Sequence, residues 1–287
     1  MQKVKIIECP RDAMQGIHEY LPTAMKAAYI NQLLKVGFDT IDFGSFVSPK
    51  AIPQMRDTAE VLNLLDLSKT TSKLLAIVAN VRGAQDASYF EEIDFLGFPF
   101  SISETFQLRN TNATIEESLG MVDEISDICA KTNKKLVVYI SMGFGNPYGD
   151  IWNVDICSEW TNKFHQMGIS TIALSDTIGI ANPETIAYLF SKLIPEYPQM
   201  EIGAHFHTTP RTWKEKISTA HQNGCRRYDA AIKGYGGCPM AKDDLTGNMP
   251  TENLLYYFEE IGIDTGLDEM EFIKAMSLAN EVFPAKA

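Results

Sequence analysis

Eight short runs of apolar and β-branched residues recur along the 287-residue chain. They span residues 4–8, 39–44, 74–80, 93–101, 135–141, 170–176, 200–206 and 227–234. Runs of this length and composition are typical of buried strands. The pattern therefore predicts eight strands spread over most of the chain.

Segments with a helical spacing separate most of these predicted strands. Apolar residues recur at every third or fourth position in residues 114–132 and 182–194, as on the buried face of a helix. Residues 82–91, between the third and fourth predicted strands, leave room for only a short helix. Strands that alternate with helices pair in parallel, and eight such units favour an α/β fold of the closed (β/α)8 TIM-barrel type.

The carboxyl-terminal part predicts two further helices. Residues 249–262 would form the eighth helix of the barrel, and residues 267–283 an added helix in an extension over about residues 265–287. The sequence contains no Pro/Gly/Ser-rich linker and no charge block that would divide it. We therefore expect a single catalytic barrel domain over residues 1–287.

Composition and charge narrow the classes of function. The formal net charge is −12 and the pI is near 4.9, whereas proteins that bind nucleic acid or membrane surfaces need clustered Lys and Arg. Hydrophobic residues make up 45% of the chain, enough for a large core, but no run approaches the roughly 20 apolar residues of a spanning helix. We expect neither nucleic acid nor membrane as a partner, and an anionic substrate would need a local cationic pocket.

The amino terminus and the cysteines bear on location. The segment MQKVKIIECP lacks the apolar core of a secretory leader and the Arg-rich pattern of a transit peptide, so we expect a cytoplasmic protein. The five cysteines are odd in number and scattered, which fits neither a disulfide framework nor a zinc-ribbon spacing. We expect them to be reduced.

Polar residues gather where the predicted strands end. The active site of such a barrel lies at the carboxyl ends of its strands, so side chains from distant parts of the sequence would share one rim. The candidates are Glu8, Arg11, Asp12, Asp42, Ser45, Ser141, Asp176, His205, His207, Cys238 and Asn248.

The segment HFH at the end of the seventh strand favours a metal site. Alternate side chains of a strand share a face, so His205 and His207 would point into the barrel mouth and Phe206 toward the outer helices. With Asp12 as a third ligand and the Asn248 amide oxygen as a further candidate, the mixed N/O set suits Mg²⁺ or Mn²⁺ and does not exclude Zn²⁺, Co²⁺ or Fe²⁺. The alternative is two ordinary histidines at a strand end.

Three other residues have both a chemical and a structural interpretation. Arg11 could stabilise an oxyanion beside a metal, or form a surface ion pair with Asp12. Cys238, on the glycine-rich segment GYGGCPMA, could move over a site and meet a substrate, or be an inert buried thiol. Asp176 could accept a proton or bind a ligand, or cap the segment that follows it.

Taken together, these motifs resemble those of the 3-hydroxy-3-methylglutaryl-CoA (HMG-CoA) lyases. This family belongs to a metal-dependent barrel superfamily that also contains isopropylmalate and homocitrate synthases. The likeness runs from about residue 3 to residue 265 through PRDAMQ, SFVSPKAIPQM, TIEES, SDTIG, HFH, GGCP and GNMPTE, in that order. The combination of SFVSPK with GGCP is more specific to the lyases than any single motif.

The resemblance implies a role for individual residues of this chain. It implies metal ligation by Asp12, His205, His207 and Asn248, a catalytic Arg11, acidic roles for Asp42 and Asp176, and a general acid at Cys238. We add Gln15 and Ser141 as candidates that bind substrate with Arg11, and Lys50, Arg109 and Asn112 as candidates for the polar arms and phosphates of CoA.

The sequence also departs from the family pattern. The segment ECPRD is one residue shorter than the usual EVGPRD, so Glu8 need not occupy the position of the family's Glu. Asp42 stands where the family has Glu, and Thr208 stands where it has Asp after the histidine pair. Met142 and Asn146 replace two cysteines that follow the family's fifth strand.

The activity that the resemblance implies is retro-Claisen cleavage of (S)-HMG-CoA to acetyl-CoA and acetoacetate. A base, Asp176 or His205, would take the proton of the tertiary hydroxyl. Arg11 would stabilise the enolate, and Cys238 in its thiol form would protonate the departing carbanion. We expect an acyl-CoA thioester as substrate and a homo-oligomer, with a dimer as the guess.

Four alternatives stay open at this point. The same barrel and metal set could serve a synthase that condenses an acyl-CoA with a 2-oxo acid, or an aldolase that acts on a 4-hydroxy-2-oxo acid. A metal-dependent hydrolase also uses an H-x-H pair, but after the first strand of its barrel. A non-catalytic binding barrel would need no metal.

Overall fold

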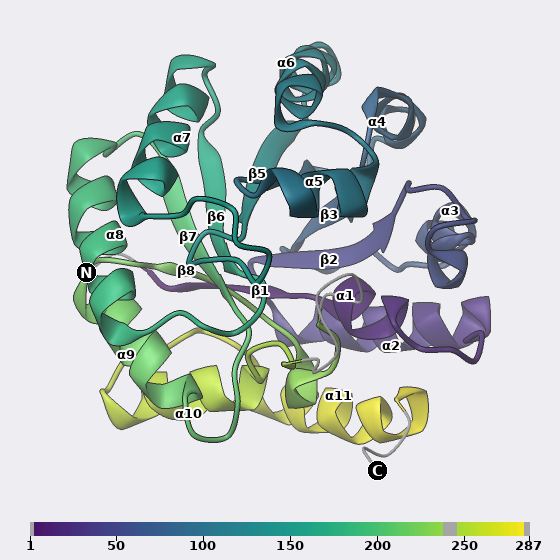
Figure 1. The fold of residues 1–287 in the computed structure, drawn as a ribbon. Helices are drawn as coiled ribbons and strands as arrows, with labels where there is room; N and C mark the ends of the chain where they lie inside the picture. The colour runs from purple at the N-terminus through teal and green to yellow at the C-terminus, as the bar shows by residue number, and fades with distance from the viewer. Residues whose placement is uncertain (1–2, 238–245, 284–287) are drawn as a thin grey trace.

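The computed structural model describes residues 3–237 and 246–283, and it contains a closed barrel of eight strands in the order β1 to β8 (Figure 1). Neighbouring strands pair in parallel all the way round. The predicted (β/α)8 TIM barrel is therefore confirmed. The strands are β1 (Lys5–Glu8), β2 (Thr40–Ser45), β3 (Lys73–Ile77), β4 (Phe95–Ser101), β5 (Lys135–Ser141), β6 (Thr171–Asp176), β7 (Glu201–Phe206) and β8 (Arg227–Ala230).

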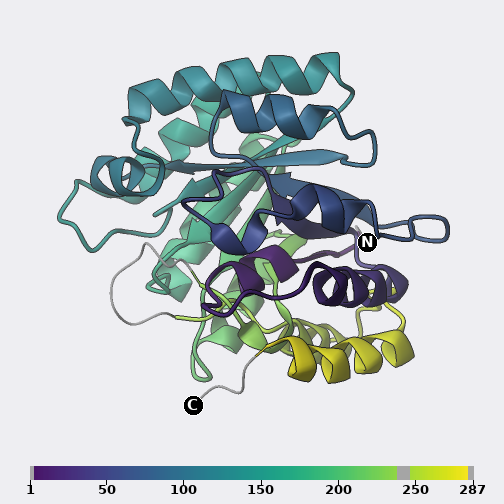
Figure 2. The ribbon, with the colours of Figure 1, turned by 90° about the vertical axis from the view of Figure 1, so that its right-hand side faces the viewer.

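Helices surround the barrel, as Figures 1 and 2 show. They are α1 (Pro10–Gln15), α2 (Thr23–Val36), α3 (Thr58–Leu62), α4 (Val81–Ser88), α5 (Glu104–Thr111), α6 (Ile115–Lys131), α7 (Val154–Gln166), α8 (Pro183–Glu196), α9 (Trp213–Gln222), α10 (Thr251–Glu260) and α11 (Glu269–Val282). Two short 3-10 helices, η1 (Pro53–Met55) and η2 (Ile232–Gly234), complete the elements of the described residues. None of the helices in these residues is both long and apolar enough to cross a membrane.

The added carboxyl-terminal helix packs against α2. Figure 2 shows α11 lying alongside α2 on the outside of the barrel. Gln32 donates a hydrogen bond to the main-chain carbonyl of Glu271, and the rings of Phe38 and Phe272 meet edge to face. The predicted helix over residues 267–283 is therefore confirmed, two residues shorter at its start and one at its end.

Side-chain caps explain where several helices begin. The Asn80 side chain accepts a hydrogen bond from the Gly83 amide at the start of α4, so the short helix predicted near residues 82–91 exists. Thr114 and Glu117 form a capping box at the start of α6, in which each side chain bonds the main chain of the other residue. Such caps satisfy main-chain N–H groups that have no partner inside the helix.

Two predicted strands run past the carboxyl ends of the observed ones, and local geometry explains why. The third ends at Ile77 rather than residue 80, because Asn80 already caps α4. The eighth ends at Ala230 rather than residue 234. Beyond it the chain turns through η2, where Lys233 has a φ of 60° and the Gly234 amide bonds the Ala231 carbonyl.

The interior of the barrel is filled by a small apolar layer below the carboxyl ends of the strands. Leu75, Val137 and Ala173 form a buried cluster with Ile77 and Tyr139, and the last two also line a cavity above it. A much larger core lies between the strands and the surrounding helices. The filled interior means that a ligand can enter only at the rim.

Glu8 points away from the barrel interior. Its carboxylate accepts hydrogen bonds from the Ile232 amide, at 2.8 Å, and from the Thr251 hydroxyl, at 2.6 Å. It therefore joins the end of β1 to η2 and to the first residue of α10, and it does not line the cavity. Burial raises the pKa of Glu8 from 4.5 to about 8, although the two hydrogen bonds act in the opposite direction.

We expect the Glu8→Gln protein to lose a pH dependence of stability that the wild type shows. Because the folded pKa of Glu8 lies above its unfolded value, its contribution to the free energy of unfolding falls as pH rises from about 4.5 to about 8. The loss is on the order of several kcal/mol. Urea unfolding at pH 5.5 and pH 8.5 should show a larger decrease for the wild type than for the variant. Equal decreases in the two proteins would contradict the assignment.

Candidate metal centre and active site

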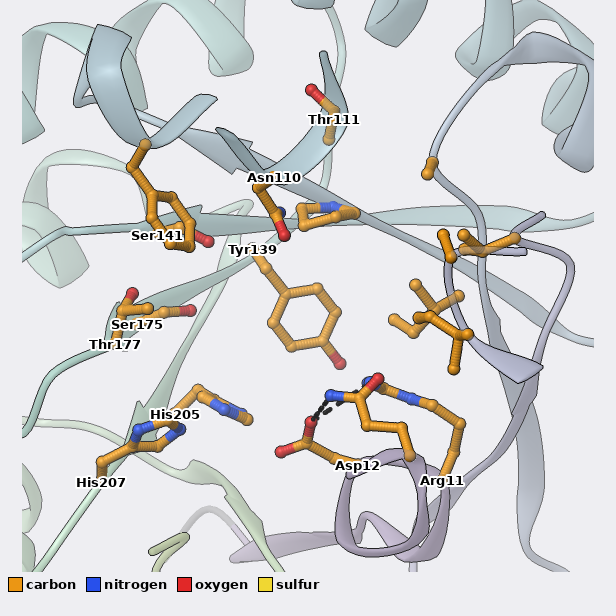
Figure 3. A pocket seen from close by; sticks show the side chains of 18 residues that line it. Arg11, Asp12, Asn110, Thr111, Tyr139, Ser141, Ser175, Thr177, His205 and His207 are labelled. Carbon is orange, nitrogen blue, oxygen red and sulfur yellow. Dashed lines mark hydrogen bonds and ion pairs between the residues drawn. The ribbon is translucent and has the colours of Figure 1, made fainter. Parts of the chain in front are cut away.

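A cavity of about 290 Å³ opens at the carboxyl ends of the strands (Figure 3). Its polar side carries Arg11, Asp12, Gln15, His205 and His207. The lining also includes the apolar side chains of Val47, Ile52, Ile77, Pro99 and Phe106. A concave site with a few converging polar groups on an apolar wall is typical of small-molecule pockets.

Asp12, His205 and His207 converge at this cavity. One potential ligand atom from each lies within 4.8 Å of the others, although nearly two hundred residues separate Asp12 from the histidines. Asp12 comes from α1, and the histidines come from the end of β7. Phe206 points outward between them and packs against Phe144 and Phe190, as the two-residue period of a strand requires.

Burial and neighbouring charges set the protonation states of Asp12 and His207. Burial alone would raise the pKa of Asp12, but the charge of Arg11, and then those of the histidines, lower it, so the carboxylate is ionised at neutral pH. Burial lowers the pKa of His207 to about 4, which keeps its imidazole neutral and its lone pair free. An ionised carboxylate and a neutral imidazole are donors that divalent cations accept, and His205 adds a second nitrogen in its neutral form.

Asp229 orients His205. The Asp229 Oδ2 atom lies 3.2 Å from His205 Nδ1, and its Oδ1 atom accepts a hydrogen bond of 2.8 Å from Arg227. Burial would lower the pKa of His205, but this hydrogen bond and the charge of Asp229 raise it. Because Nδ1 faces Asp229, Nε2 is the ring nitrogen left for the cavity, an arrangement common behind metal-binding histidines.

Sequence reasoning missed Asp229, although it lies inside the predicted eighth strand. Its side chain is fully buried in β8, and its register partner on β7 is His205. The available signal was an acidic residue in the middle of an otherwise buried strand, since charged side chains are rarely buried there without a partner.

Asn248 lies beside Asp12. Its Nδ2 atom donates to Asp12 Oδ2 at 2.6 Å and to the Tyr235 carbonyl at 2.9 Å, and its main chain forms an isolated bridge with His207. The amide nitrogen faces the carboxylate here, whereas ligation of a cation would use the amide oxygen. Gly236 packs on both residues: with a φ of 88°, a Cβ there would lie 2.6 Å from the Asp12 carbonyl oxygen.

Arg11 is held by three side chains. Its Nε and Nη2 atoms donate to the Asp42 carboxylate, with a shortest distance of 2.6 Å. Nη1 donates to Asp12 at 3.2 Å and to Gln15 at 2.8 Å. Burial alone would lower the pKa of Arg11, but the charges of Asp42 and Asp12 raise it. The guanidinium is therefore a fixed positive charge at the edge of the cavity.

Asp42 contributes to the site through Arg11. Its carboxylate is buried beneath the guanidinium and does not line the cavity. The family resemblance implies an acidic role for Asp42. In the structure Asp42 is the ion-pair partner of Arg11, and its two parallel contacts orient the guanidinium.

The structure does not bring Asp176 into the cavity. Asp176 pairs in register with the outward-facing Phe206, so its side chain points toward the helices. One carboxylate oxygen lies 2.5 Å from Lys216 Nζ, and the other accepts a hydrogen bond from the Ala181 amide. Its neighbours Ser175 and Thr177 line the cavity instead. These contacts match the structural interpretation of Asp176, in which it anchors the segment that follows it.

The predicted substrate-binding residues divide into two groups. Gln15 and Ser141 line the cavity. Lys50 and Asn112 are exposed and do not line it. Asn112 ends α5 with a left-handed φ of 54°, so the chain turns away at this residue.

The remaining candidates lie elsewhere. Arg109 is exposed, and its guanidinium stacks over the Tyr148 ring rather than lining the cavity. Ser45 is buried and accepts a hydrogen bond from the Val47 amide. Cys238 lies outside the described residues.

Several residues that line the cavity were not predicted. Asn110, Thr111, Tyr139, Ser175 and Thr177 all project into it, and the Tyr139 hydroxyl points toward Arg11 and Asp12 (Figure 3). Tyr139 lies two residues before Ser141 on the same strand, so the alternation of β5 places both on the inner face. That alternation was the signal that could have identified Tyr139.

Comparisons with known proteins show the family of this chain. A family model described as HMGL-like matches residues 3–279. The hydroxymethylglutaryl-CoA lyase of Bacillus subtilis is 33% identical over 284 residues, which cover 98% of this chain and 93% of that protein. The mitochondrial hydroxymethylglutaryl-CoA lyase of Macaca fascicularis is 34% identical over 278 residues, which cover 96% of this chain and 84% of that protein.

Solved structures give the same result. The crystal structure of the B. subtilis HMG-CoA lyase superposes with a TM-score of 0.91 at 33% identity, covering 98% of this chain and 94% of that one. An HMG-CoA lyase from Acinetobacter baumannii, in complex with coenzyme A and 3-methylmalate, superposes with a TM-score of 0.90 at 32% identity. This second match covers 98% of this chain and 91% of the other.

Proposed function

This chain belongs to the HMGL-like family, and on that premise we propose that it is a divalent-metal-dependent lyase that cleaves (S)-HMG-CoA to acetyl-CoA and acetoacetate. The observation that carries the proposal is the convergence of Asp12, His205 and His207 beside Arg11 in one cavity. Near-full-length similarity to HMG-CoA lyases, one of them bound to coenzyme A, supports the substrate class.

The residues present fit a divalent cation. Asp12 supplies an ionised oxygen and the two histidines supply nitrogens. The Asn248 amide nitrogen faces Asp12, so Asn248 would add its oxygen only after the amide turns over. We propose Mg²⁺ or Mn²⁺, because these ions favour a set that includes oxygen donors. When bound, such an ion would hold the tertiary hydroxyl and the carboxylate of the acyl group and lower the pKa of that hydroxyl.

The contacts of Asp176 and His205 support a base other than these two residues. Asp176 is outside the cavity, and His205 has only Nε2 to offer, which can bind a cation or accept a proton but cannot do both at once. Asp12 is ionised and lines the cavity, and its Oδ1 atom accepts from Arg11 and Gln15 while Oδ2 accepts from Asn248. If the Asn248 amide turns away, one oxygen can bind the cation while the other accepts the hydroxyl proton. We therefore assign proton acceptance to Asp12 and ligation to His205.

Arg11 stabilises the charge that the reaction develops. When the bond between C2 and C3 breaks, its electron pair passes to the acetyl-CoA unit and charge gathers on the thioester oxygen. The contacts of Arg11 described above use four of its five N–H groups, which leaves one Nη2 N–H for that oxygen. A donor fixed in advance costs no reorganisation when the charge appears. Cys238 would then return a proton to the carbanion.

A steady-state assay with HMG-CoA tests this function. We expect equal amounts of acetoacetate and acetyl-CoA, loss of turnover on treatment with a chelator, and recovery on addition of Mg²⁺ or Mn²⁺. A parallel incubation with acetyl-CoA and 2-oxo acids should release no free CoA. Release of CoA there without cleavage of HMG-CoA would replace the lyase with a condensing synthase.

A further inference from the structure

Lys216 is a lysine whose side chain is completely buried beside the candidate metal centre. It lies on α9, and its ammonium group makes three contacts, with Asp176 Oδ2 at 2.5 Å, the Gly179 carbonyl at 2.9 Å and the His207 carbonyl at 2.9 Å. These contacts match the three N–H groups of an ammonium. A charge removed from water persists only when it is paired and hydrogen-bonded in this way.

These contacts join three segments at the rim of the barrel. Asp176 ends β6, Gly179 belongs to the turn that follows it, and His207 comes directly after β7. Asp176 also accepts a hydrogen bond from the Ala181 amide, so it fixes the start and the end of that turn. Lys216 therefore holds the His207 main chain from the outer side of the barrel, while the His207 imidazole points into the cavity.

We propose that the Lys216–Asp176 ion pair is a positioning device for the His207 imidazole. The inference rests on the proposed function only in that it takes His207 as a cation ligand. The carbonyl that Lys216 holds is bonded to the Cα atom that carries the imidazole, so the contact limits both position and direction of the ring. Asp176 fixes Lys216 in turn. The pair acts on the chemistry through His207 and touches no substrate.

A second buried ion pair provides a matched control. Lys26 lies 2.7 Å from Asp57 and also donates to the main-chain carbonyl of Gln54. This pair resembles the first in burial and in its mixture of carboxylate and carbonyl acceptors, but it joins α2 to the residues before α3. Neither Lys26 nor Asp57 lines the cavity.

The test compares Lys216→Met/Asp176→Asn with Lys26→Met/Asp57→Asn. Each double variant removes both charges of its pair, so neither protein is left with a single buried charge. The readout is the Mn²⁺ dissociation constant, measured by electron paramagnetic resonance at a temperature where circular dichroism shows every protein to be folded. We expect binding about 10- to 100-fold weaker in the first variant, the range found when groups behind metal ligands are altered. The second variant should bind as the wild type does.

Each outcome has one meaning. Wild-type affinity in the Lys216/Asp176 variant would overturn the positioning role. Equal weakening in both variants would also overturn it, because the effect would then follow general destabilisation. A wild-type protein that binds no Mn²⁺ would overturn both this inference and the metal centre. Mn²⁺ binding without HMG-CoA cleavage would contradict only the proposed lyase activity. The comparison of Mn²⁺ dissociation constants would still decide the role of the Lys216–Asp176 pair.

Discussion

The protein with Arg11→Met and Asp42→Asn is expected to cleave HMG-CoA about 10²- to 10³-fold more slowly than the wild type at saturating substrate. This is the decrease in kcat found when an enzyme loses one fixed hydrogen-bond donor to an oxyanion. Arg11 is the cation that the structure places at the edge of the cavity beside the candidate metal ligands. Asp42 is changed with it because a buried carboxylate without its partner would destabilise the fold. The measurement is kcat from acetoacetate formation.

Two controls separate lost chemistry from lost structure. Asp42→Asn alone should keep more activity than the double variant, because Arg11 retains its charge and its contacts with Asp12 and Gln15. Lys26→Met/Asp57→Asn removes a buried cation and carboxylate elsewhere and should keep wild-type kcat. Turnover close to that of the wild type in the Arg11 variant would contradict the proposed enolate stabilisation.

The Asp12→Ala protein is expected to lose both cation binding and turnover. Asp12 supplies the anionic group of the cluster, and its partners His205 and His207 supply no negative charge. Changes to groups behind metal ligands already weaken metal binding by about 10- to 100-fold, so loss of a ligand itself should weaken it by more than about 100-fold. Isothermal titration with Mn²⁺ measures the affinity directly.

Glu8→Gln is the matched control for this loss. Glu8 is also a buried acid close in sequence to Asp12, but it faces outward and bonds Ile232 and Thr251. Its replacement should leave Mn²⁺ affinity unchanged. If Asp12→Ala bound Mn²⁺ as tightly as Glu8→Gln does, the ion would have to bind elsewhere.

Much of the fold could be predicted because it follows from local patterns. The alternation of apolar runs with helical segments indicated eight parallel strands. The helix caps at Asn80 and Thr114 involve residues only three positions further along the chain. Strand ends were less accurate. The eighth predicted strand continues through residues 231–234, whereas the main chain turns there, because the turn depends on a left-handed φ at Lys233 that the strand pattern does not record.

The candidate site was predictable to a similar degree. The two-residue period of a strand was enough to place His205 and His207 together, with Phe206 opposite them. The same period did not decide which of Ser175 and Asp176 faces inward, because both are polar and one residue of slippage exchanges them. Both Asp42 and Asp176 looked chemically active in the sequence, yet each proved to be the partner of a buried cation.

By itself, the sequence determined the elements of this protein, their parallel pairing in a barrel, and the rim on which polar residues gather. These properties follow from spacing along the chain, which local sterics and hydrophobic burial translate directly into structure. Only the tertiary structure decided what each carboxylate does. Asp12 faces the histidines, Asp42 holds Arg11, Asp229 orients His205 and Asp176 pairs with Lys216. The chemistry of an acidic group is set by its burial and by the charge beside it, and most of those neighbours come from remote parts of the chain.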